Sequence, residues 1–288
     1  MRSAITEFLE ASAGVPEIDR VAVFDNDGTL WCERPSYVQK LFVEWSVSER
    51  VERDRGYIPP ALLSSLSGLS IGDLAPGVVA AAINDVFAGL RPEEFAAVVT
   101  RFRRAWRHDD LGVSLLGLRY APMLELVEAL RRRAFDVFIV TGGGADFVRA
   151  LAHELYGVPP DRVVGSLVGY EFNGVDLVRG TELVGPPNEG AEKVSRIQTM
   201  LGRRPIFAAG NSAGDTEMLQ YALGSGTPAL AVLIDHDDDE REYAYRSVAA
   251  SLSDGRDIAE MGRAGGWTVV SMRHDWSTVF AHDESPER

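Results

Sequence analysis

Short apolar runs alternate along the chain with segments in which apolar residues recur at helical spacing. Residues 121–133 and 190–202 place apolar side chains at i, i+3, i+4 and i+7, as helices that cover a sheet do. Four apolar runs are bounded by turn residues, which is typical of buried strands in a parallel sheet. The pattern predicts an α/β fold with a doubly wound parallel sheet. The four expected strands are RVAVFD (20–25), FDVFIVTGG (135–143), RPIFAAGNS (204–212) and ALAVLID (229–235).

A long segment after the first strand interrupts this alternation. Between about residues 35 and 118, three stretches are helical in period and no strand-like run separates them. We therefore expect an all-helical domain inserted after the first strand, so that residues 1–31 and 119–288 form the α/β domain and residues 32–118 the insertion. The three helical stretches are 37–51, 77–90 and 92–108.

Two further segments have a clear local pattern. Ile5, Phe8 and Leu9 lie at helical spacing near the start of the chain. Residues 165–183 read as a β-hairpin with Asn173 and Gly174 as its turn.

Composition and charge limit the classes of partner. The formal net charge is −14 and the pI is near 4.8, which disfavours a nucleic-acid partner because phosphate backbones need a basic face. No run approaches the roughly 18 apolar residues of a membrane span, and no signal peptide is evident, so we expect a cytoplasmic protein without a membrane partner. Cys32 is the only cysteine, which excludes an intrachain disulfide and a zinc knuckle, and the five histidines lack metal-ligand spacing.

Polar residues follow the expected strands, where doubly wound sheets bind their ligands. Carboxylates, a hydroxyl followed by glycines, and a lysine at one sheet edge suit a divalent hard cation and a phosphoryl group. The sequence therefore predicts a site for Mg²⁺ and a phosphorylated compound. The candidates are Asp25, Asp27, Thr141, Gly142, Gly143, Gly144, Asn211, Ser212 and Asp215, with Lys193 from the start of an expected helix.

Four motifs carry a resemblance to a known family. FDNDGTL, IVTGG, Lys193 in NEGAEKVSRIQ, and GNSAGDTEML are similar, in order and spacing, to the signature motifs of haloacid dehalogenase-like hydrolases. The helical insertion between the first two motifs resembles the C1-type cap of the phosphoserine phosphatase branch. The resemblance implies a Rossmann-like core with a helical cap, and a Mg²⁺-dependent phosphatase that acts on a small phosphorylated metabolite.

The resemblance also implies a role for each matching residue. Asp25 attacks phosphorus, and Asp27 protonates the leaving oxygen and then deprotonates the water that hydrolyses the aspartyl phosphate. Thr141 and the loop glycines Gly142 and Gly143 bind phosphoryl oxygens, and Lys193 neutralises charge. Mg²⁺ is held by the Asp25 carboxylate, the Asp27 backbone carbonyl and the fourth-motif loop.

The fourth motif departs from many phosphatases of this branch, which have aspartate directly after its glycine. Here Asn211 stands at that position and Asp215 lies four residues on. Either Asn211 binds Mg²⁺ weakly and Asp215 acts through water, or Asp215 takes over directly. On both alternatives Asp215 is essential, and Asn211→Asp is expected to preserve activity and tighten metal binding.

Trp31 and Glu33 follow the nucleophile, where the family places a mobile flap, and we expect them to contact substrate. Phosphoserine phosphatases have a glutamate in a similar place that meets the substrate ammonium group. A salt bridge to Arg34 or to a residue of the cap is the other interpretation of Glu33. Serine phosphate is thus one of several candidate small phosphomonoesters.

Other functions and local interpretations stay open. The fold also suits a phosphotransferase or phosphomutase, or a catalytically silent binding protein. Thr141 alone fits a helix N-cap, and Lys193 alone a surface lysine. The acidic residues 235–242 fit either a second cation site or, preferably, the start of a helix. The arginines of 101–108 fit an anion patch or, preferably, the solvated face of a helix whose other face holds Phe95, Val98, Val99, Phe102 and Trp106.

Overall fold

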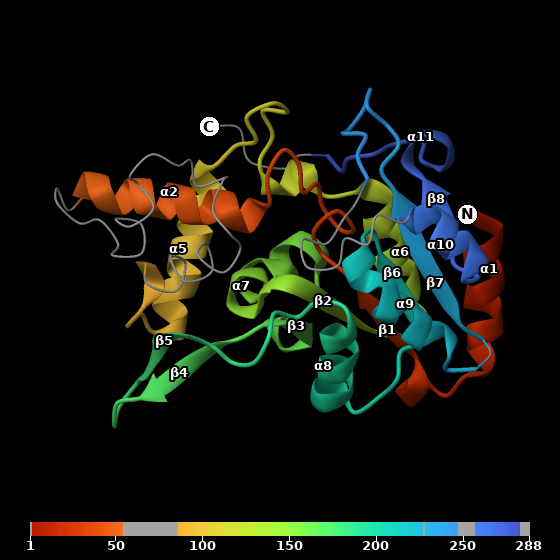
Figure 1. The fold of residues 1–288 in the computed structure, drawn as a ribbon, viewed down its shortest axis with the longest axis horizontal. Helices are drawn as coiled ribbons and strands as arrows, with labels where there is room; N and C mark the ends of the chain where they lie inside the picture. Colours follow the sequence, from red (N-terminus) through yellow and green to blue (C-terminus); the bar gives the residue numbers. More distant parts are fainter. Residues whose placement is uncertain (1, 54–85, 227, 247–256, 283–288) are drawn as a thin grey trace.

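A six-stranded sheet forms the centre of the molecule. The structure is a computed structural model that describes residues 2–53, 86–226, 228–246 and 257–282. All neighbouring strands are parallel (Figure 1). The strands are β1 (Val21–Phe24), β2 (Asp136–Gly144), β3 (Val163–Ser166), β6 (Phe207–Gly210), β7 (Leu230–Asp235) and β8 (Thr268–Ser271).

The strand order creates a natural ligand site. The sheet runs β3-β2-β1-β6-β7-β8, so the chain builds one half outward from β1 and then returns to build the other half. In open α/β sheets, ligands bind outside the carboxyl ends of the strands where the order reverses. That place here lies beyond β1 and its neighbours β2 and β6.

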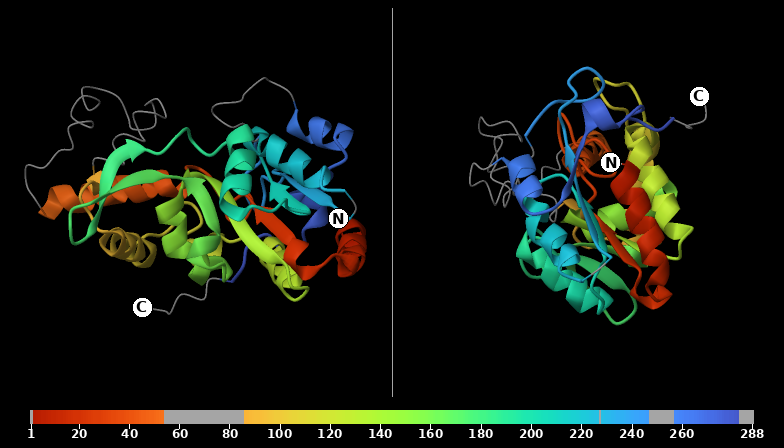
Figure 2. Two further views of the ribbon diagram at one scale, coloured as in Figure 1. Left: turned by 90° about the horizontal axis from the view of Figure 1, so that it is seen from below. Right: turned by 90° about the vertical axis from the view of Figure 1, so that its right-hand side faces the viewer.

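Helices cover both faces of the sheet, as Figure 2 shows. Alternate strand residues belong to the two hydrophobic clusters: Ala22 and Phe24 to one, Val21 and Val23 to the other. The first cluster includes residues of α1 (Arg2–Ala11), α6 (Ala121–Arg131) and α7 (Ala145–Tyr156). The second includes residues of α8 (Ala191–Leu201), α9 (Thr216–Leu223) and α10 (Ile258–Ala264). A short α11 (Met272–Asp275) follows β8.

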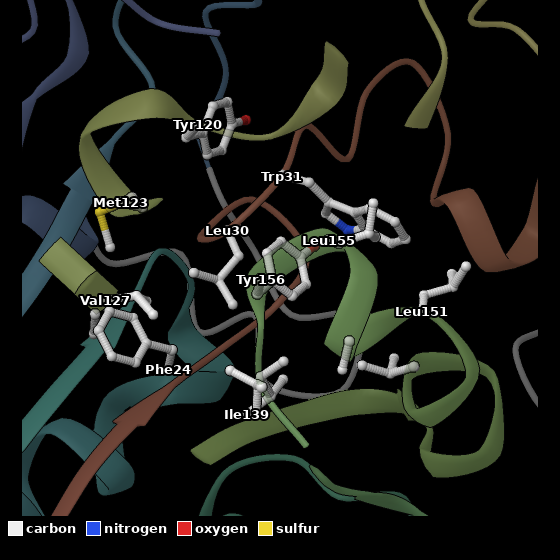
Figure 3. Close-up of a cluster of buried hydrophobic side chains, with 14 of the residues drawn as sticks. Phe24, Leu30, Trp31, Tyr120, Met123, Val127, Ile139, Leu151, Leu155 and Tyr156 are labelled. Atoms are coloured by element: carbon white, nitrogen blue, oxygen red, sulfur yellow. The ribbon is translucent and has the colours of Figure 1, made fainter. Parts of the chain in front are cut away.

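The first cluster continues from the sheet to the segment after β1. Figure 3 shows Leu30 and Trp31 packed among residues of β1, β2, α6 and α7. Both side chains are buried. The chain that follows the predicted nucleophile is therefore held by the core on its apolar side.

Two helices of the predicted insertion lie beside α7 (Figure 1). They are α2 (Val38–Arg53) and α5 (Pro92–Ala105). Phe42 of α2 stacks on Phe87 and contacts Phe147 of α7, with ring centroids 5.1 and 5.0 Å apart. Residues 32–53 and 86–118 contain no strand, as expected. Most of the expected helix 77–90 lies outside the described residues, so the domain boundaries stay a prediction.

The predicted hairpin is present as β4 (Val168–Phe172) and β5 (Leu177–Leu183). Its turn is longer than expected, because Phe172 pairs with Leu177 and leaves a four-residue loop. Asn173 Oδ1 accepts hydrogen bonds from the amides of Val175 and Asp176, which fixes this loop. The hairpin contacts the insertion: Gly89 N donates to the Arg179 carbonyl at 2.7 Å.

The four expected strands and the parallel, doubly wound arrangement are confirmed. The edge strands β3 and β8 were not predicted. The expected helices at 121–133 and 190–202 appear as α6 and α8, and the one at the start of the chain as α1. No helix among the described residues is long and apolar enough to cross a membrane.

Candidate active site

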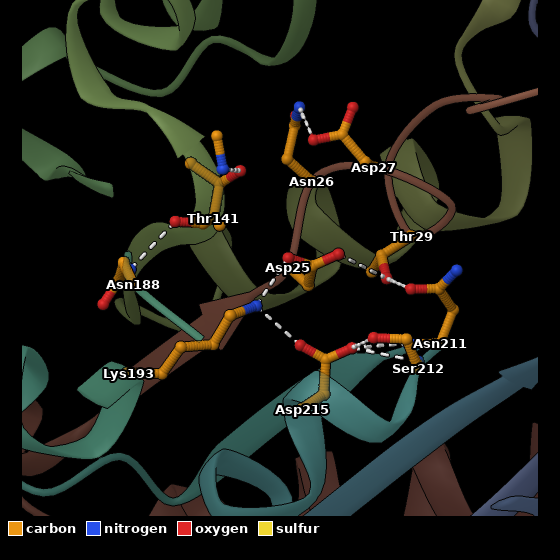
Figure 4. Close-up of polar contacts among 12 residues, drawn as sticks. Asp25, Asn26, Asp27, Thr29, Thr141, Asn188, Lys193, Asn211, Ser212 and Asp215 are labelled. Carbon is orange, nitrogen blue, oxygen red and sulfur yellow. Dashed lines mark hydrogen bonds and ion pairs between the residues drawn. The ribbon is translucent and has the colours of Figure 1, made fainter. Parts of the chain in front are cut away.

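The polar residues predicted from the strand ends converge at the carboxyl edge of the sheet (Figure 4). They arrive from different elements, since Asp25 and Asp27 follow β1, Thr141 lies in β2, and Lys193 lies in the first turn of α8. Asn211 follows β6, and Asp215 ends the short 3-10 helix Ala213–Asp215.

Lys193 joins two of the carboxylates. Its Nζ lies 2.6 Å from Asp25 Oδ1 and 2.6 Å from Asp215 Oδ1, and the residue is only 2% exposed. Burial alone would lower the pKa of Lys193, but Asp215 and Asp25 together raise it above its ordinary value. The ammonium group is therefore charged at neutral pH, and the surface interpretation of Lys193 is wrong.

Asp25 occupies an environment that disfavours its charge. It is 6% exposed, and its second oxygen, Oδ2, lies 3.4 Å from Thr29 Oγ1. Burial raises the pKa of Asp25 well above its ordinary value and Asp215 adds to this, while Lys193 acts in the opposite direction. More positive charge at this point would keep Asp25 ionised.

Asp27 lies beyond Asp25 as seen from Lys193, and neighbouring side chains hold it there (Figure 4). Trp31 Nε1 donates to Asp27 Oδ1 at 3.0 Å, and Asn26 Nδ2 lies 3.5 Å from Oδ2. Burial raises the pKa of Asp27, although the hydrogen bonds from Trp31 and Asn26 lower it. The raised pKa suits a general acid. β1 ends at Phe24, before these residues, and the Asn26 side chain turns toward Asp27.

The glycine-containing end of β2 meets the insertion. Thr141 Oγ1 accepts a hydrogen bond from Gly143 N at 3.0 Å, and Gly144 N donates to Gln39 Oε1 of α2 at 2.8 Å. A Cβ on Gly143 would lie 2.9 Å from Gln39 Oε1, so a side chain there would displace this contact. Gly144, not Thr141, is the N-cap of α7, which makes the simple helix-cap interpretation of Thr141 wrong.

Gly142 is also confined, because a Cβ there would lie 3.2 Å from the Glu189 side chain. Asn188 Nδ2 donates to the Thr141 carbonyl at 2.9 Å and so anchors the same stretch from the loop before α8. The phosphate-binding candidates thus lie in one ordered segment.

Asp215 shapes the loop after β6. Its Oδ2 accepts hydrogen bonds from Asn211 N at 3.1 Å, Ser212 N at 3.0 Å and Ser212 Oγ at 3.2 Å. Its Oδ1 is bound by Lys193. With both oxygens engaged, this arrangement does not favour Asp215 as a direct metal ligand. Asn211, whose Oδ1 lies 3.4 Å from Thr29 Oγ1, is placed better for that role.

The side chains of Trp31 and Glu33 are both hydrogen-bonded to other residues of the site. Trp31 binds Asp27, as described, and Glu33 Oε1 lies 3.3 Å from Asn211 Nδ2. Burial raises the pKa of Glu33, and Asp27 adds to this. The Arg34 guanidinium lies over the Tyr245 ring, 4.0 Å from its centroid. The structure therefore gives Glu33 a partner that neither sequence interpretation named.

His236 was missed by the sequence reasoning. It follows β7 directly, with Nε2 2.8 Å from the Gly28 carbonyl and Nδ1 3.3 Å from Glu242 Oε2. The rule that functional residues follow buried strands would have indicated it, had it been applied to β7. Gln39, Thr29 and Asn188 had no comparable signal, because their contacts are made across the fold.

The two charged runs have structural roles. No helix begins within residues 236–246, so the expected helix start is wrong. Residues 239–241 form a turn, and Asp238 binds Arg241. Among the described residues no group of three or more His, Cys, Asp and Glu side chains is arranged for a metal. In α5, Phe95, Val99 and Phe102 are buried, and Arg103 pairs with Glu154 of α7 at 2.9 Å.

The residues at the carboxyl edge fit a divalent cation. Lys193 is shared by the carboxylates of Asp25 and Asp215, the Asp27 carboxyl group lies beyond Asp25, and burial raises the pKa of Asp25 and Asp27. Such an excess of buried negative charge is what a bound dication offsets. Mg²⁺ takes only one or two carboxylates and otherwise uses neutral oxygens and water. The Asp25 carboxylate, the Asp27 carbonyl and Asn211 Oδ1 supply that kind of donor set.

Comparisons with known proteins point to one family. The family model described as haloacid dehalogenase-like hydrolase matches residues 22–220, which include Asp25, Lys193 and Asp215. None of the curated protein sequences matches the chain.

Solved structures resemble the fold. A protein of unknown function from Bordetella pertussis Tohama I has 17% identity and a TM-score of 0.53, with 87% of this chain and 97% of that chain covered. A conserved functionally unknown protein from Anaerococcus prevotii DSM 20548 has 15% identity and a TM-score of 0.59, with 93% and 91% covered. A phosphoserine phosphohydrolase-like protein from Francisella tularensis subsp. tularensis SCHU S4 has 16% identity and a TM-score of 0.42, with 85% and 99% covered. For the first two structures, the likeness at these identities shows the fold alone.

Proposed function

The chain belongs to the haloacid dehalogenase-like hydrolases, and from this premise we propose that it is a Mg²⁺-dependent phosphatase of a small phosphomonoester, with Asp25 as the nucleophile. The observation that carries the proposal is the buried contact of Lys193 with Asp25 and Asp215, together with Asp27 two residues on. A carboxylate nucleophile needs no base, but it must approach an anionic phosphate. Lys193 offsets part of that repulsion.

The Asp25 carboxylate, the Asp27 backbone carbonyl and Asn211 Oδ1 would hold Mg²⁺. Mg²⁺ supplies positive charge that stabilises the phosphoryl oxygens during transfer. Asp215 acts through its contacts with Lys193 and with the loop amides, and not as a direct ligand.

The chemistry then follows from two carboxyl groups. An oxygen of Asp25 forms a bond to phosphorus while the bond from phosphorus to the ester oxygen breaks, and Asp27 gives its proton to that leaving oxygen. Asp27, now ionised, takes a proton from water, whose oxygen attacks phosphorus. Phosphate leaves and Asp25 is restored as a carboxylate. The raised pKa of Asp27 supports the first proton transfer.

Thr141 and the Gly142 amide would bind the phosphoryl oxygens, and the Gly143 amide would do so on exchanging its hydrogen bond to Thr141 Oγ1 for one to phosphate. The segment ends at the N-terminus of α7, where the helix dipole favours an anion. The substrate is proposed only as a small phosphorylated metabolite, since Glu33 contacts Asn211 and its position does not single out an ammonium-bearing ester.

The test is phosphate release from a panel of phosphate esters with Mg²⁺ and with chelator. We expect Mg²⁺-dependent release that Asp25→Asn lowers by about 10³-fold or more, each tenfold being about 1.4 kcal/mol of barrier. Asp176→Asn, in the exposed hairpin loop, is the control and should leave turnover unchanged.

Unchanged turnover in Asp25→Asn, or no release from any ester with Mg²⁺ present, would overturn the proposal. Added alcohol acceptors separate hydrolysis from phosphotransfer, because a transferase passes the phosphoryl group to the alcohol in preference to water.

A further inference from the structure

The two ends of the Asn211 amide face different groups. Asn211 is 1% exposed; its Oδ1 lies 3.4 Å from Thr29 Oγ1, which is itself 3.4 Å from Asp25 Oδ2. Its Nδ2 lies 3.3 Å from Glu33 Oε1. An asparagine, unlike an aspartate, presents a metal-binding oxygen at one end only. Its usefulness as a ligand therefore depends on which end faces Asp25.

Glu33 selects this orientation. An ionised carboxylate only accepts hydrogen bonds, so it favours the NH₂ end of the amide and repels the oxygen end. Glu33 is 7% exposed, so little water competes for the contact. His236 Nε2 is 3.5 Å from Asn211 Nδ2, but it lies 2.8 Å from the Gly28 carbonyl, to which it must donate its hydrogen. His236 is thus not an acceptor for the amide.

Gly28 makes the contact possible. Its φ is +71°, and a Cβ there would lie 1.9 Å from Asn211 Nδ2 and 3.0 Å from the Glu33 carboxyl carbon. Any side chain at position 28 would separate Glu33 from Asn211. The backbone of the nucleophile loop is therefore shaped to let these two side chains meet.

We propose that Glu33 is a positioning residue that holds Asn211 with its amide oxygen toward Asp25 and the Mg²⁺ site. The proposal rests on the proposed function, because it concerns a residue of the same site. It assigns Glu33 to metal binding through Asn211 and not to recognition of a substrate ammonium group.

This role of Glu33 adds a cost to Asn211→Asp, which the sequence alone predicts only to tighten metal binding. A carboxylate at position 211 would lie beside buried Glu33, and two like charges at such a distance disfavour each other. Asn211→Asp therefore lowers the melting temperature in chelator. The double variant Asn211→Asp with Glu33→Gln removes the repulsion, since the glutamine amide can donate to the new carboxylate.

The experiment measures Mg²⁺ affinity by calorimetry, together with the melting temperature with Mg²⁺ and with chelator. Glu33→Met removes the acceptor and should weaken Mg²⁺ binding about 10- to 100-fold, the usual effect of losing a partner that orients a ligand. Glu33→Gln keeps an acceptor oxygen and should retain most of the affinity.

A double-mutant cycle tests whether Glu33 acts through Asn211. In an Asn211→Ala background, Glu33→Met should change Mg²⁺ affinity by less than about twofold. An equal loss of Mg²⁺ affinity in both backgrounds, or unchanged affinity in Glu33→Met alone, would overturn the inference. The proposed function would still stand in that case, provided that the wild type binds Mg²⁺ and turns over phosphate esters. Absence of Mg²⁺ binding by the wild type would overturn both.

Two variants, Asn211→Asp alone and Asn211→Asp combined with Glu33→Gln, keep the inference testable if Glu33→Met fails to fold. Asn211→Asp should melt lower than wild type in chelator, and the double variant should recover that loss and bind Mg²⁺ at least as tightly as wild type. Equal melting temperatures for Asn211→Asp and wild type would show that Glu33 does not repel a carboxylate at position 211, and would overturn the inference.

Discussion

Replacement of Lys193 by methionine should destabilise the protein more than any surface substitution. Lys193 Nζ is 2.6 Å from two buried carboxylates. At an effective dielectric constant of about 20, one such attraction is about 6 kcal/mol, which the burial of the charges partly offsets. Removal of one member of a buried charge cluster typically costs about 3–5 kcal/mol, because the partner charges remain. We expect a loss of that size at pH 7.5.

The loss should depend on pH. The folded-state pKa of Lys193 is raised, so the lysine stabilises the protein fully below its unfolded pKa of about 10.4 and loses this effect only as pH rises through the folded value. The raised pKa of Asp25 already makes wild-type stability fall as pH rises above about 4; without Lys193 that pKa rises further, so the fall continues to a higher pH in the variant than in the wild type. The difference between variant and wild type is therefore larger at pH 7.5 than at pH 5.

Urea unfolding in chelator measures both effects without a contribution from metal. Lys40→Met is the matched control, because Lys40 and Lys193 are the only lysines of the sequence and Lys40 pairs with Glu44 at a solvent-accessible position. That control should cost no more than about 0.5 kcal/mol. A loss below about 1 kcal/mol in Lys193→Met, or the same loss at both pH values, would refute the reasoning about the buried cluster.

Three further substitutions test the site. Asp27→Asn should slow alkyl phosphates more than a nitrophenyl phosphate, by about 10²-fold overall, because a poor leaving group depends most on protonation; equal losses on both would show that Asp27 is only structural. Trp31→Phe removes a hydrogen bond that lowers the pKa of Asp27, so the alkaline limb of the kcat/KM profile should move to higher pH. An unmoved limb would contradict this. Asp215→Ala should raise the Mg²⁺ midpoint of activity about 10- to 100-fold, and a normal midpoint would show that the loop does not form the metal site.

The central strands were predictable because each carries its own signal. β1, β2 and β7 each contain a continuous apolar run, with Asp25 directly after β1, Thr141 near the end of β2 and His236 directly after β7. β3 and β8 have four residues each and lie at the sheet edges. A run that short has too little pattern to be distinguished from loop, and it becomes a strand by pairing with a longer neighbour.

The sequence indicated which residues form the site, but not which side chains they contact. The strand-end rule indicated Asp25, Thr141 and Asn211, and the fold brings them together. It did not indicate that Glu33 contacts Asn211, because those residues are 178 positions apart and meet only when β6 lies beside β1. The scarcity of lysine was a usable signal: in a chain that otherwise uses arginine, a lysine at a helix start is conspicuous.

Phosphate binding should depend on Mg²⁺ because Lys193 alone cannot attract an anion. The formal net charge is −14, and the charge of Lys193 is already offset by Asp25 and Asp215. The amides at the start of α7 contribute only partial charge. Inorganic phosphate should therefore bind weakly in chelator and at least about tenfold more tightly with Mg²⁺, and by linkage phosphate should tighten Mg²⁺ by the same factor. Calorimetric titration of phosphate with and without Mg²⁺ measures this coupling, and equal affinities would contradict a phosphate site that is completed by the metal.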